Sequence, residues 1–527
     1  MRMIGSMPSF RFSRNPGLTL IAFIGVLLLA YEAAQLVIAG DFNSLVMSGL
    51  VFVGLAIVVA ILNDWRRGLY LLLGWILFED LFRKYLGNNM AVFFAKDILA
   101  VVLYISFFAA RRERLIKIFK PPFLLPLLFF VWFGVIQMLN PASTSIFYGF
   151  LGMKVYFLYV PLLYVGYSLM ETELDLRKFL SFNTILFIIV ASLGMAQSIL
   201  GPRFLNPTVI QEDIRTLSTT YRVSPISGLV AYRPNAVFVS AGRFENFLVM
   251  SWIVALGFGG YLLLRSRRGR NLAFLSIGII GVASIMSASR GVFMYNAADA
   301  LVIVAAFLWG APWRQGEARR ILRAIQRTLL VVGLAILVML SIFPDKIESR
   351  LAIFSETLSP YSPTSELANR AGEYPFKNFM LAFEHERWPY GYGIGTASLG
   401  VQYVVRIMHA TPMLIGVESG YGQLIVELGI LGLILWIFLG IAVSVSAWKA
   451  ANRLRGTPWY PIGFVIFWYG FMILGPKSYI SFISYQDYLM NSYLWVLLGI
   501  LFRLPQLAQE TMQLETSANL ASANGQA

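Results

Sequence analysis

Two arginines near the middle of the sequence have the chemistry of an anion-binding pair. They stand in Arg233-Pro-Asn-Ala-Val-Phe-Val-Ser-Ala-Gly-Arg243-Phe-Glu245, directly before a long apolar run. A guanidinium binds phosphate oxygens in bidentate fashion with fixed geometry, so two arginines at the mouth of a membrane span suit a diphosphate. The alternative for Arg243 is a salt bridge to Glu245 or to another neighbouring residue.

Two further cations stand inside or between apolar runs. Arg290 lies in Ser287-Ala-Ser-Arg290-Gly291, where one apolar run ends and the next begins. It is either a functional charge facing the bundle interior or a snorkelling arginine at a helix end. Lys154 either adds to a phosphate site or belongs to a structural ion pair. The other charges within apolar runs are expected to form structural ion pairs or to line a cavity: Glu79, Asp80, Lys96, Asp97 and Asp299.

A glycine-rich segment follows later, Pro389-Tyr-Gly391-Tyr-Gly393-Ile-Gly395. Three glycines at alternate positions allow a close approach of another backbone. No Walker lysine follows and no Rossmann strand precedes the segment, which argues against nucleotide binding.

Two carboxylates come after it, near the start of another apolar run. Glu418 stands at the expected membrane mouth, where it could accept a proton, and Glu427 lies about two turns further in. A carboxylate inside a membrane is costly unless it is paired or lines a polar cavity.

The elements that position these residues follow from composition. The chain has 527 residues, of which 58% are hydrophobic and 13% charged, a mean hydropathy of +0.70 and no cysteine. These values exclude a soluble domain, and the aromatic content of 15% excludes a disordered chain. The apolar runs are continuous over about 17–25 residues, so a polytopic all-α membrane protein is expected and not a β-barrel.

About 14 membrane helices are expected, with 12–14 as the range. The runs fall near residues 17–39, 44–63, 68–85, 91–110, 121–139, 146–169, 179–200, 244–264, 272–289, 291–309, 328–344, 423–447, 461–476 and 489–503. The N-terminal segment has three arginines and no small-residue cleavage pattern, so it is expected to be a retained helix. Lys/Arg clusters then place both termini in the cytoplasm, which also accounts for the net charge of +15 without nucleic acid.

Four regions result from this topology. Residues 1–343 hold helices 1–11 with an outer segment at about 201–243, and 344–421 form an outer cap of amphipathic helices. Residues 422–505 hold helices 12–14, and 506–527 form a polar, disordered tail. The outer segments carry an unexpected set of arginines that asks for an anionic ligand: Arg203, Arg215, Arg222, Arg233, Arg243, Arg290, Arg350, Arg370, Arg387 and Arg406.

Between about 230 and 440 the chain resembles the O-antigen ligase/polymerase superfamily of bacterial inner-membrane proteins, which includes the Wzy-type polymerases. Many helices and one large periplasmic segment late in the chain are typical of that family. The order and spacing of several short motifs carry the resemblance: Arg233, Ser289-Arg290-Gly291, Arg370 some 20 residues before Pro389, Gly391 and Gly393, then Tyr421, Glu427, Gly429 and Gly432.

The chain departs from the family at one position. Where the family usually has His-Asn, this chain has Glu418-Ser419, and His409 lies nine residues upstream of Glu418. Either Glu418 takes the role of the missing histidine, or the protein belongs to a divergent branch with another base. The departure puts ligase activity in particular doubt.

The resemblance implies a GT-C-like fold and glycosyl transfer at the periplasmic face of the inner membrane. The donor is then an undecaprenyl-diphosphate-linked glycan, and the acceptor a sugar hydroxyl of another lipid-linked repeat unit. Glu418 is the candidate base and is expected at a desolvated position. Arg290 and Arg233 are the first candidates to stabilise the leaving diphosphate, with Arg370, Arg243 and Lys154 next.

Aromatic side chains are expected to stack on sugar rings: Trp388, Tyr390, Tyr392 and Tyr421. No acidic pair with metal-ligand spacing occurs in the outer segments, so neither metal nor cofactor is expected. Expected partners are the lipid-linked glycan, the bilayer and a chain-length regulator. Two alternatives remain open. One is a ligase that transfers finished glycan to lipid A core or another acceptor; the other is a lipid or glycan transporter, which predicts inverted repeats and broken helices.

Overall fold

The chain was analysed in a computed structural model. The structure describes residues 42–86, 90–112, 119–207, 220–265, 268–312, 341–359, 373–401, 404–405 and 416–524, with single positions between 323 and 340. The chain divides into two compact units, Met1–Leu71 and Leu72–Ala527, and the candidate functional residues all belong to the second.

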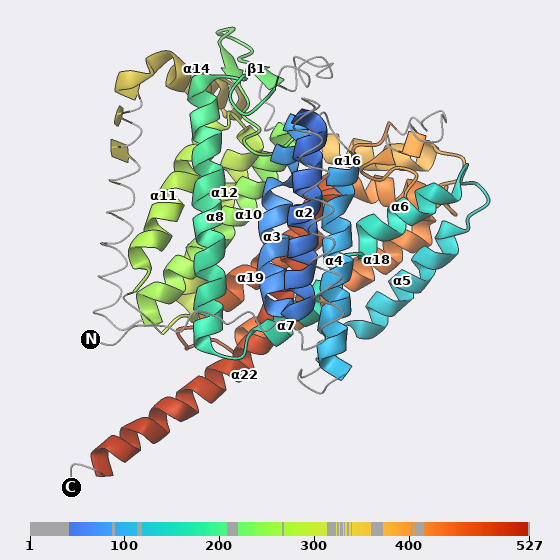
Figure 1. Ribbon diagram of the computed structural model, residues 1–527. Coiled ribbons are helices and arrows are strands. Elements are labelled where there is room, and N and C mark those ends of the chain that lie inside the picture. The colour runs from blue at the N-terminus through green and yellow to red at the C-terminus, as the bar shows by residue number, and fades with distance from the viewer. Residues whose placement is uncertain are drawn as a thin grey trace. The chain divides into compact units, whose positions relative to one another are not determined.

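Helices make up most of the described chain (Figure 1). Their bounds are α2 Phe42–Asn63, α3 Trp65–Tyr85, α4 Met90–Arg112, α5 Leu124–Met138, α6 Ile146–Phe157, α7 Leu162–Leu169, α8 Glu173–Leu200, α10 Ala241–Arg265, α11 Arg270–Met286, α12 Arg290–Gly310, α14 Pro344–Leu358, α16 Glu373–Met380, η2 Leu381–Glu384, α18 Gly420–Asn452, α19 Tyr460–Leu474, α20 Pro476–Ile480, α21 Ile483–Gln486 and α22 Tyr488–Asn524.

Seven of the described helices are long and apolar enough to cross a membrane. They are Ala91–Arg112, Ile146–Leu169, Glu173–Leu200, Ala241–Arg265, Arg290–Gly310, Gly420–Asn452 and Tyr488–Ser517. The architecture is therefore that of an all-α polytopic membrane protein, as the composition predicted. Of the other expected spans, 17–39 lies outside the described residues and 328–344 is only partly within them.

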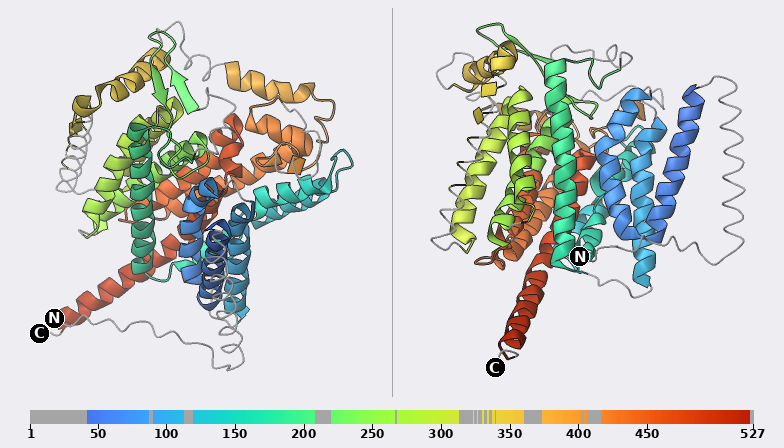
Figure 2. Two further views of the ribbon diagram at one scale, coloured as in Figure 1. Left: turned by 45° about the horizontal axis from the view of Figure 1, so that its top comes forward. Right: turned by 60° about the vertical axis from the view of Figure 1, so that its left-hand side comes forward.

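The C-terminal tail differs from the sequence-based prediction. Residues 506–524 were expected to be disordered, but they continue α22 as helix, which extends away from the other helices (Figure 2). Two ion pairs hold this extension, Arg503 with Glu510 at 2.8 Å and Arg265 with Glu515. A polar composition alone does not exclude a helix, because Ala, Gln, Glu and Leu are all strong helix formers.

A small hairpin lies beside α14. Strands β1, Tyr221–Val223, and β2, Val230–Tyr232, pair antiparallel. The carboxylate of Glu356 on α14 accepts hydrogen bonds from the Ser224 hydroxyl and from the backbone N–H groups of Ile226 and Ser227 in the hairpin turn. These donors, the Ser224 hydroxyl above all, lower the pKa of Glu356 to about 2.

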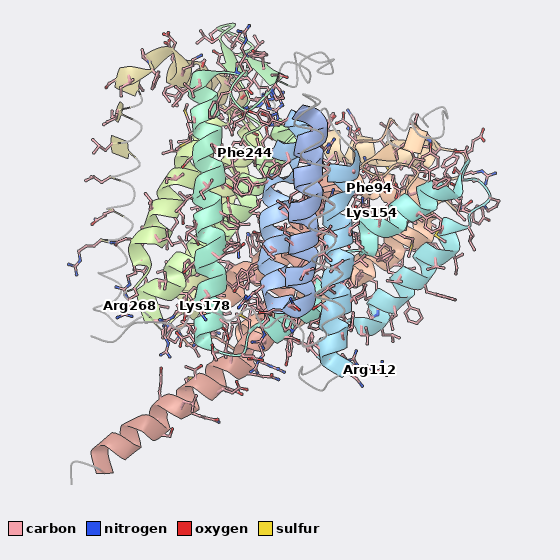
Figure 3. All side chains as sticks on the ribbon, in the orientation of Figure 1. Phe94, Arg112, Lys154, Lys178, Phe244 and Arg268 are labelled. Atoms are coloured by element: carbon pink, nitrogen blue, oxygen red, sulfur yellow. The ribbon has the colours of Figure 1, made fainter. Side chains whose placement is uncertain are left out.

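The ends of the second unit differ in their side chains and loops. The hairpin, α14 and α16 lie at one end, here called the loop end (Figure 1). Arg112, Lys178 and Arg268 lie at the opposite end, here called the basic end (Figure 3). Successive helices run between the two ends, so the loop end holds the first residues of α10, α12, α18 and α22.

We expect the two ends to face opposite sides of the membrane. The chain has no cysteine, so cysteines introduced at exposed Ser227 in the hairpin and exposed Ser517 in α22 can be labelled without background. With an impermeant thiol reagent on sealed vesicles, Ser227→Cys and Ser517→Cys should label from opposite sides. Labelling of both from one side would contradict this topology.

Candidate functional site

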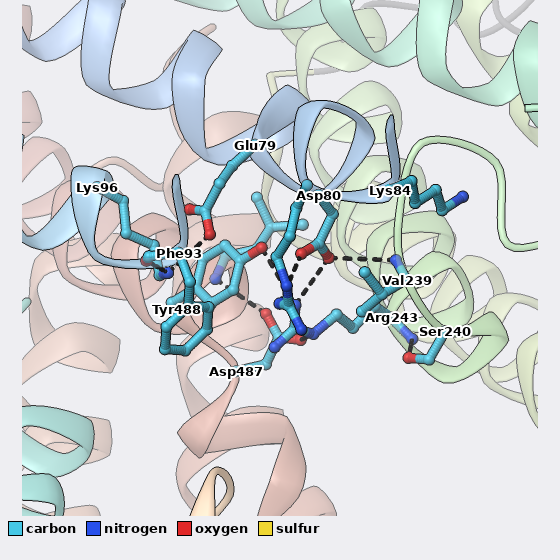
Figure 4. Close-up of polar contacts among 12 residues, drawn as sticks. Glu79, Asp80, Lys84, Phe93, Lys96, Val239, Ser240, Arg243, Asp487 and Tyr488 are labelled. Atoms are coloured by element: carbon cyan, nitrogen blue, oxygen red, sulfur yellow. Dashed lines mark hydrogen bonds and ion pairs between the residues drawn. The ribbon is translucent and has the colours of Figure 1, made fainter. Parts of the chain in front are cut away.

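Arg243 lies in a buried ion cluster near the loop end (Figure 4). Its guanidinium, from the first turn of α10, is 2.7 Å from the Asp80 carboxylate on α3 and 3.4 Å from that of Asp487. It also donates to the Tyr488 hydroxyl at 3.2 Å and lies over the Tyr488 ring. From the sequence, the expected partner of Arg243 was a diphosphate, Glu245 or a neighbouring residue. The structure gives it two buried carboxylates instead.

The other charges within apolar runs pair in the same manner. Lys96 donates to Glu79 at 2.8 Å, and Lys154 lies 2.6 Å from Asp97. Arg83 adds a second cation to Asp80 at 3.3 Å. The prediction that these residues form structural ion pairs is confirmed for Glu79, Asp80, Lys96, Asp97 and Lys154. A phosphate could engage Lys154 only by competing with Asp97.

Arg233 follows directly after β2 and is held by a carboxylate. Its Nε donates to Glu245 Oε1 at 3.1 Å, and its Nη2 contacts the same oxygen. Glu245 is thus the partner of Arg233 and not, as the sequence suggested, of Arg243. Since both side chains keep some exposure, this pair remains open to an exchange of partners.

A strained turn connects Arg233 to α10. Ala236 has a φ of 49°, which is uncommon for a residue with a side chain. The turn is held from two sides: Gln197 accepts from the Asn235 and Ala236 N–H groups, and the buried Lys84 donates to the Ala236 carbonyl at 2.7 Å. The position of Arg233 is therefore fixed by side chains from α8 and α3.

Arg290 begins α12, after a second strained turn. Ala288 has a φ of 53°, and the Ser289 hydroxyl caps the helix by accepting from the Val292 N–H. The half-buried Arg290 stands at the positive end of the helix dipole, where a cation is unfavourable for the helix itself. Helix stability therefore does not explain an arginine at this position.

The glycine-rich segment fills a break in α18. Gly429 interrupts the helix with a φ of 72°, and Gly391 has a φ of 77°. A Cβ at Gly391 would lie 2.4 Å from the Glu427 carbonyl oxygen, and one at Gly429 would lie 2.4 Å from the Pro389 carbonyl oxygen. The close backbone approach that the glycine spacing predicted is thus made to α18.

Glu427 ties this loop to two other segments. Its buried carboxylate accepts from the Tyr156 hydroxyl at 2.7 Å, the Ala397 N–H at 2.8 Å and the Ser398 hydroxyl at 2.8 Å. The requirement that an intramembrane carboxylate find polar partners is met by these donors. Because both carboxylate oxygens accept hydrogen bonds from the protein, Glu427 holds the loop in place and is not positioned to bind a ligand.

Glu418 lies one turn before Tyr421 at the start of α18. Its side chain is exposed, which differs from the desolvated position expected, and it accepts a hydrogen bond from the Tyr374 hydroxyl on α16. Arg370, the remaining diphosphate candidate, lies outside the described residues.

Two of the four aromatic residues proposed to bind glycan belong to one continuous aromatic cluster beside Glu418. Ring contacts with centroids 5.2–6.2 Å apart run through Trp388, Phe383, Phe379, Tyr479 and Tyr421. Of the other two, Tyr390 is 77% exposed and Tyr392 packs edge-on against His385.

The segment between α19 and α22 was missed by sequence reasoning. Its residue Ser478 contacts Gly420 so closely that a Cβ on that glycine would lie 2.0 Å from the Ser478 carbonyl oxygen. The Ser419 hydroxyl donates to the Tyr479 carbonyl at 3.0 Å. The segment also carries the buried Lys477 and Asp487. The signal available was a lysine directly after Gly-Pro at the outer end of an apolar run, where few cations are expected.

Within the described residues no group of three or more His, Asp and Glu side chains is placed to hold a metal ion. The arrangement at the loop end therefore offers arginine, lysine and carboxylate chemistry together with an aromatic surface.

We expect Arg243→Met to destabilise the protein severely. The substitution leaves Asp80 and Asp487 buried and facing one another without their shared cation, which typically costs about 3–5 kcal/mol. The thermal unfolding midpoint of the protein in detergent should fall, and adding Asp80→Asn and Asp487→Asn should restore part of it. A single variant as stable as the wild type would show that the cluster does not hold the helices together.

A glycine pair tests the docking of the loop on α18. Gly391→Ala should destabilise the protein through strain at positive φ, about 1–2 kcal/mol, and through the clash with α18, roughly 1–3 kcal/mol more. Gly228→Ala is the matched control, because Gly228 has a φ of 68° but no atom within 4 Å of an added Cβ. Equal losses in the unfolding midpoint would mean that the contact with α18 contributes nothing.

No protein-family model matches the chain, and no curated protein is significantly similar to it.

Proposed function

We propose that the protein is a glycosyltransferase of the polysaccharide polymerase type. It joins undecaprenyl-diphosphate-linked oligosaccharide repeat units, without a metal ion, in the synthesis of O-antigen or exopolysaccharide. The observation that carries this proposal is the contact between the motif segments at the loop end. Residues 389–395 fill the break of α18 at Gly429, and the start of α18, with Glu418 and Tyr421, packs on the segment of Ser478.

The donor diphosphate needs positive charge at its bridging and leaving oxygens. Negative charge on the leaving group rises as the glycosidic bond breaks, and preorganised cations stabilise that charge in a site of low dielectric. Arg233 and Arg290 are the arginines proposed for this role. Arg233 precedes the strained turn at Ala236, and Arg290 follows the strained turn at Ala288. Backbone strain of this kind is often concentrated at functional sites.

The acceptor hydroxyl needs a base, and Glu418 is the residue proposed. Its exposure leaves one side of the carboxylate open to an incoming sugar, while the Tyr374 hydroxyl orients it. The adjacent cluster from Tyr421 to Trp388 offers ring faces and edges of the kind on which the apolar faces of sugars pack. Base and glycan surface are thereby adjacent.

The reaction is assigned to the periplasmic face of the inner membrane. Arg112, Lys178 and Arg268 lie at the basic end, and an excess of cations is typical of the cytoplasmic side (Figure 3). That assignment places the loop end, with Arg233, Arg290 and Glu418, in the periplasm, where lipid-linked repeat units are polymerised in the family that the sequence resembles.

A break such as the one in α18 is also found in transporters. In transporters, such breaks expose backbone groups to a cavity for substrate. Here the Tyr392 and Gly393 N–H groups donate to the Val426 and Glu427 carbonyls at 2.8 and 2.9 Å. The freed carbonyls of α18 are therefore satisfied by the loop, which favours a structural break.

Substitution of Glu418 tests this function. Purified wild-type protein in lipid nanodiscs should convert lipid-linked repeat units into a ladder of polymers. Glu418→Gln should keep the fold and lose about 10²–10⁴-fold in rate, because an amide cannot take a proton. Glu418→His should recover part of the rate, and Glu384→Gln, an exposed control at the same end, should have none of these effects.

Near-normal turnover by Glu418→Gln would remove the base assignment. A wild-type protein that transfers finished glycan but never lengthens it would be a ligase, and one that moves the lipid without forming bonds would be a transporter.

A further inference from the structure

Lys477 lies in an unusual position at the loop end. It belongs to α20, a short helix that begins at Pro476, directly after Gly475, between α19 and α21. Its side chain is only 5% exposed, and its ammonium lies 4.8 Å from the centre of the Tyr295 ring on α12. A ring face stabilises a cation but does not satisfy its N–H donors.

The hydrogen bonding of Lys477 differs from that of every other buried cation in the described residues. Five of the six donate hydrogen bonds to oxygen, namely Arg83, Lys84, Lys96, Arg350 and Arg503. Within the same described part of the chain, the Lys477 ammonium donates none and has no carboxylate oxygen within 4.0 Å. The Lys477 side chain is buried while its ammonium finds no acceptor in the described residues, so its donors can be used by an acceptor that comes from outside the chain.

Two carboxylates face Lys477 from a greater distance. Asp299 and Glu245 both interact with it electrostatically. Asp299 on α12 accepts from the Trp468 indole at 2.8 Å through Oδ1, while its buried Oδ2 has no hydrogen-bond partner. Glu245 holds Arg233. The two acids balance the charge of Lys477 without binding its donors, and this leaves those donors available to a ligand.

Lys477 also adjoins the motif segments of the proposed site. Tyr295 places it beside α12, which Arg290 begins. Its neighbours in sequence, Ser478 and Tyr479, contact Gly420 and Ser419 at the start of α18. Through Glu245 it shares a partner with Arg233. One lysine therefore lies where three separate segments of the chain meet.

We propose that Lys477 is a binding residue for a diphosphate ester, and that with Arg233 it forms the anion site of the lipid-linked donor. This inference rests on the proposed function and names a residue that the motifs do not include. An ammonium suits the task because it is a compact point charge with three donors that can turn toward either phosphate, whereas guanidinium binds in a fixed plane. When the donor binds, the Arg233 guanidinium leaves Glu245 and binds phosphate oxygens.

Binding of farnesyl diphosphate to the full-length purified protein tests the proposal apart from catalysis. Lys477→Met removes the charge and nearly keeps the length of the side chain. We expect it to weaken farnesyl diphosphate binding, measured by microscale thermophoresis, by roughly thirtyfold or more. Lys377→Met, an exposed lysine on α16 at the same end, is the matched control and should bind like the wild type.

Two further ligands identify what the site recognises. Farnesyl phosphate should bind more weakly than the diphosphate, and inorganic pyrophosphate should compete with farnesyl diphosphate in the wild type but not in Lys477→Met. Failure of pyrophosphate to compete would mean that the prenyl chain alone carries binding, which overturns the proposal.

The stability of the ligand-free protein separates binding from structure. If Lys477 serves a ligand, Lys477→Met combined with Asp299→Asn, which leaves neither buried charge unbalanced, should unfold near the wild-type temperature and still bind farnesyl diphosphate weakly. If Lys477 serves only to neutralise Asp299, adding Asp299→Asn should restore both the stability and the diphosphate binding of Lys477→Met, which would overturn the proposal.

The experiments can refute the role of Lys477 and the polymerase function independently of one another. A wild type that binds the diphosphate but does not polymerise would refute the polymerase and leave the anion site intact. A wild type that polymerises, with Lys477→Met binding and turning over equally well, would refute the role of Lys477 alone.

Discussion

Compensation of buried charge is the constraint on which the rest of this structure depends. Arg243 lies between Asp80 and Asp487 and so joins α10 to α3 and to the start of α22. Each of these charges alone would be prohibitively costly in an apolar bundle, and together they fix three helices at the loop end. The neighbouring strained turn at Ala236 is held by the same helix α3 through Lys84. The position of Arg233 therefore depends on contacts between protein groups, namely those of Lys84 and Arg243 with their partners.

Whether a polar side chain is already paired within the protein separates structural residues from functional candidates. Arg243 and Lys154 were candidates for the diphosphate, but each is paired with carboxylates within the protein. Glu427, expected as a structural motif residue, accepts hydrogen bonds from partners within the protein. The exposed carboxylate of Glu418 accepts a hydrogen bond from Tyr374 and can accept another. Lys477 is buried, and its ammonium donates no hydrogen bond within the described residues. Within the described residues of the loop end, an exposed carboxylate and a buried cation thus keep hydrogen-bonding capacity. The proposed transfer from a lipid diphosphate to a sugar hydroxyl would use both groups.

The sequence predicted the features that depend on local pattern. Continuous apolar runs predicted helices such as α10 and α18, and alternate glycines predicted a close backbone approach at Gly391. The partners in that approach could not be predicted, because Glu427 and Tyr156 are far apart in the sequence and nothing local joins them. For the same reason the salt-bridge partner of Arg243 was sought at Glu245 or a neighbour and not at Asp80. Lys477 was overlooked because a lone lysine at the outer end of an apolar run ordinarily snorkels, and the sequence does not show that its side chain is buried.

The most direct measurement is an experimental structure of the wild-type protein in nanodiscs with farnesyl diphosphate bound. We expect a phosphate oxygen at hydrogen-bond distance from the Lys477 ammonium, about 2.7–3.2 Å, with Arg233 turned from Glu245 toward the second phosphate. A diphosphate bound at Lys154, at Arg243 or at the basic end, with the Lys477 ammonium still without an acceptor, would contradict it.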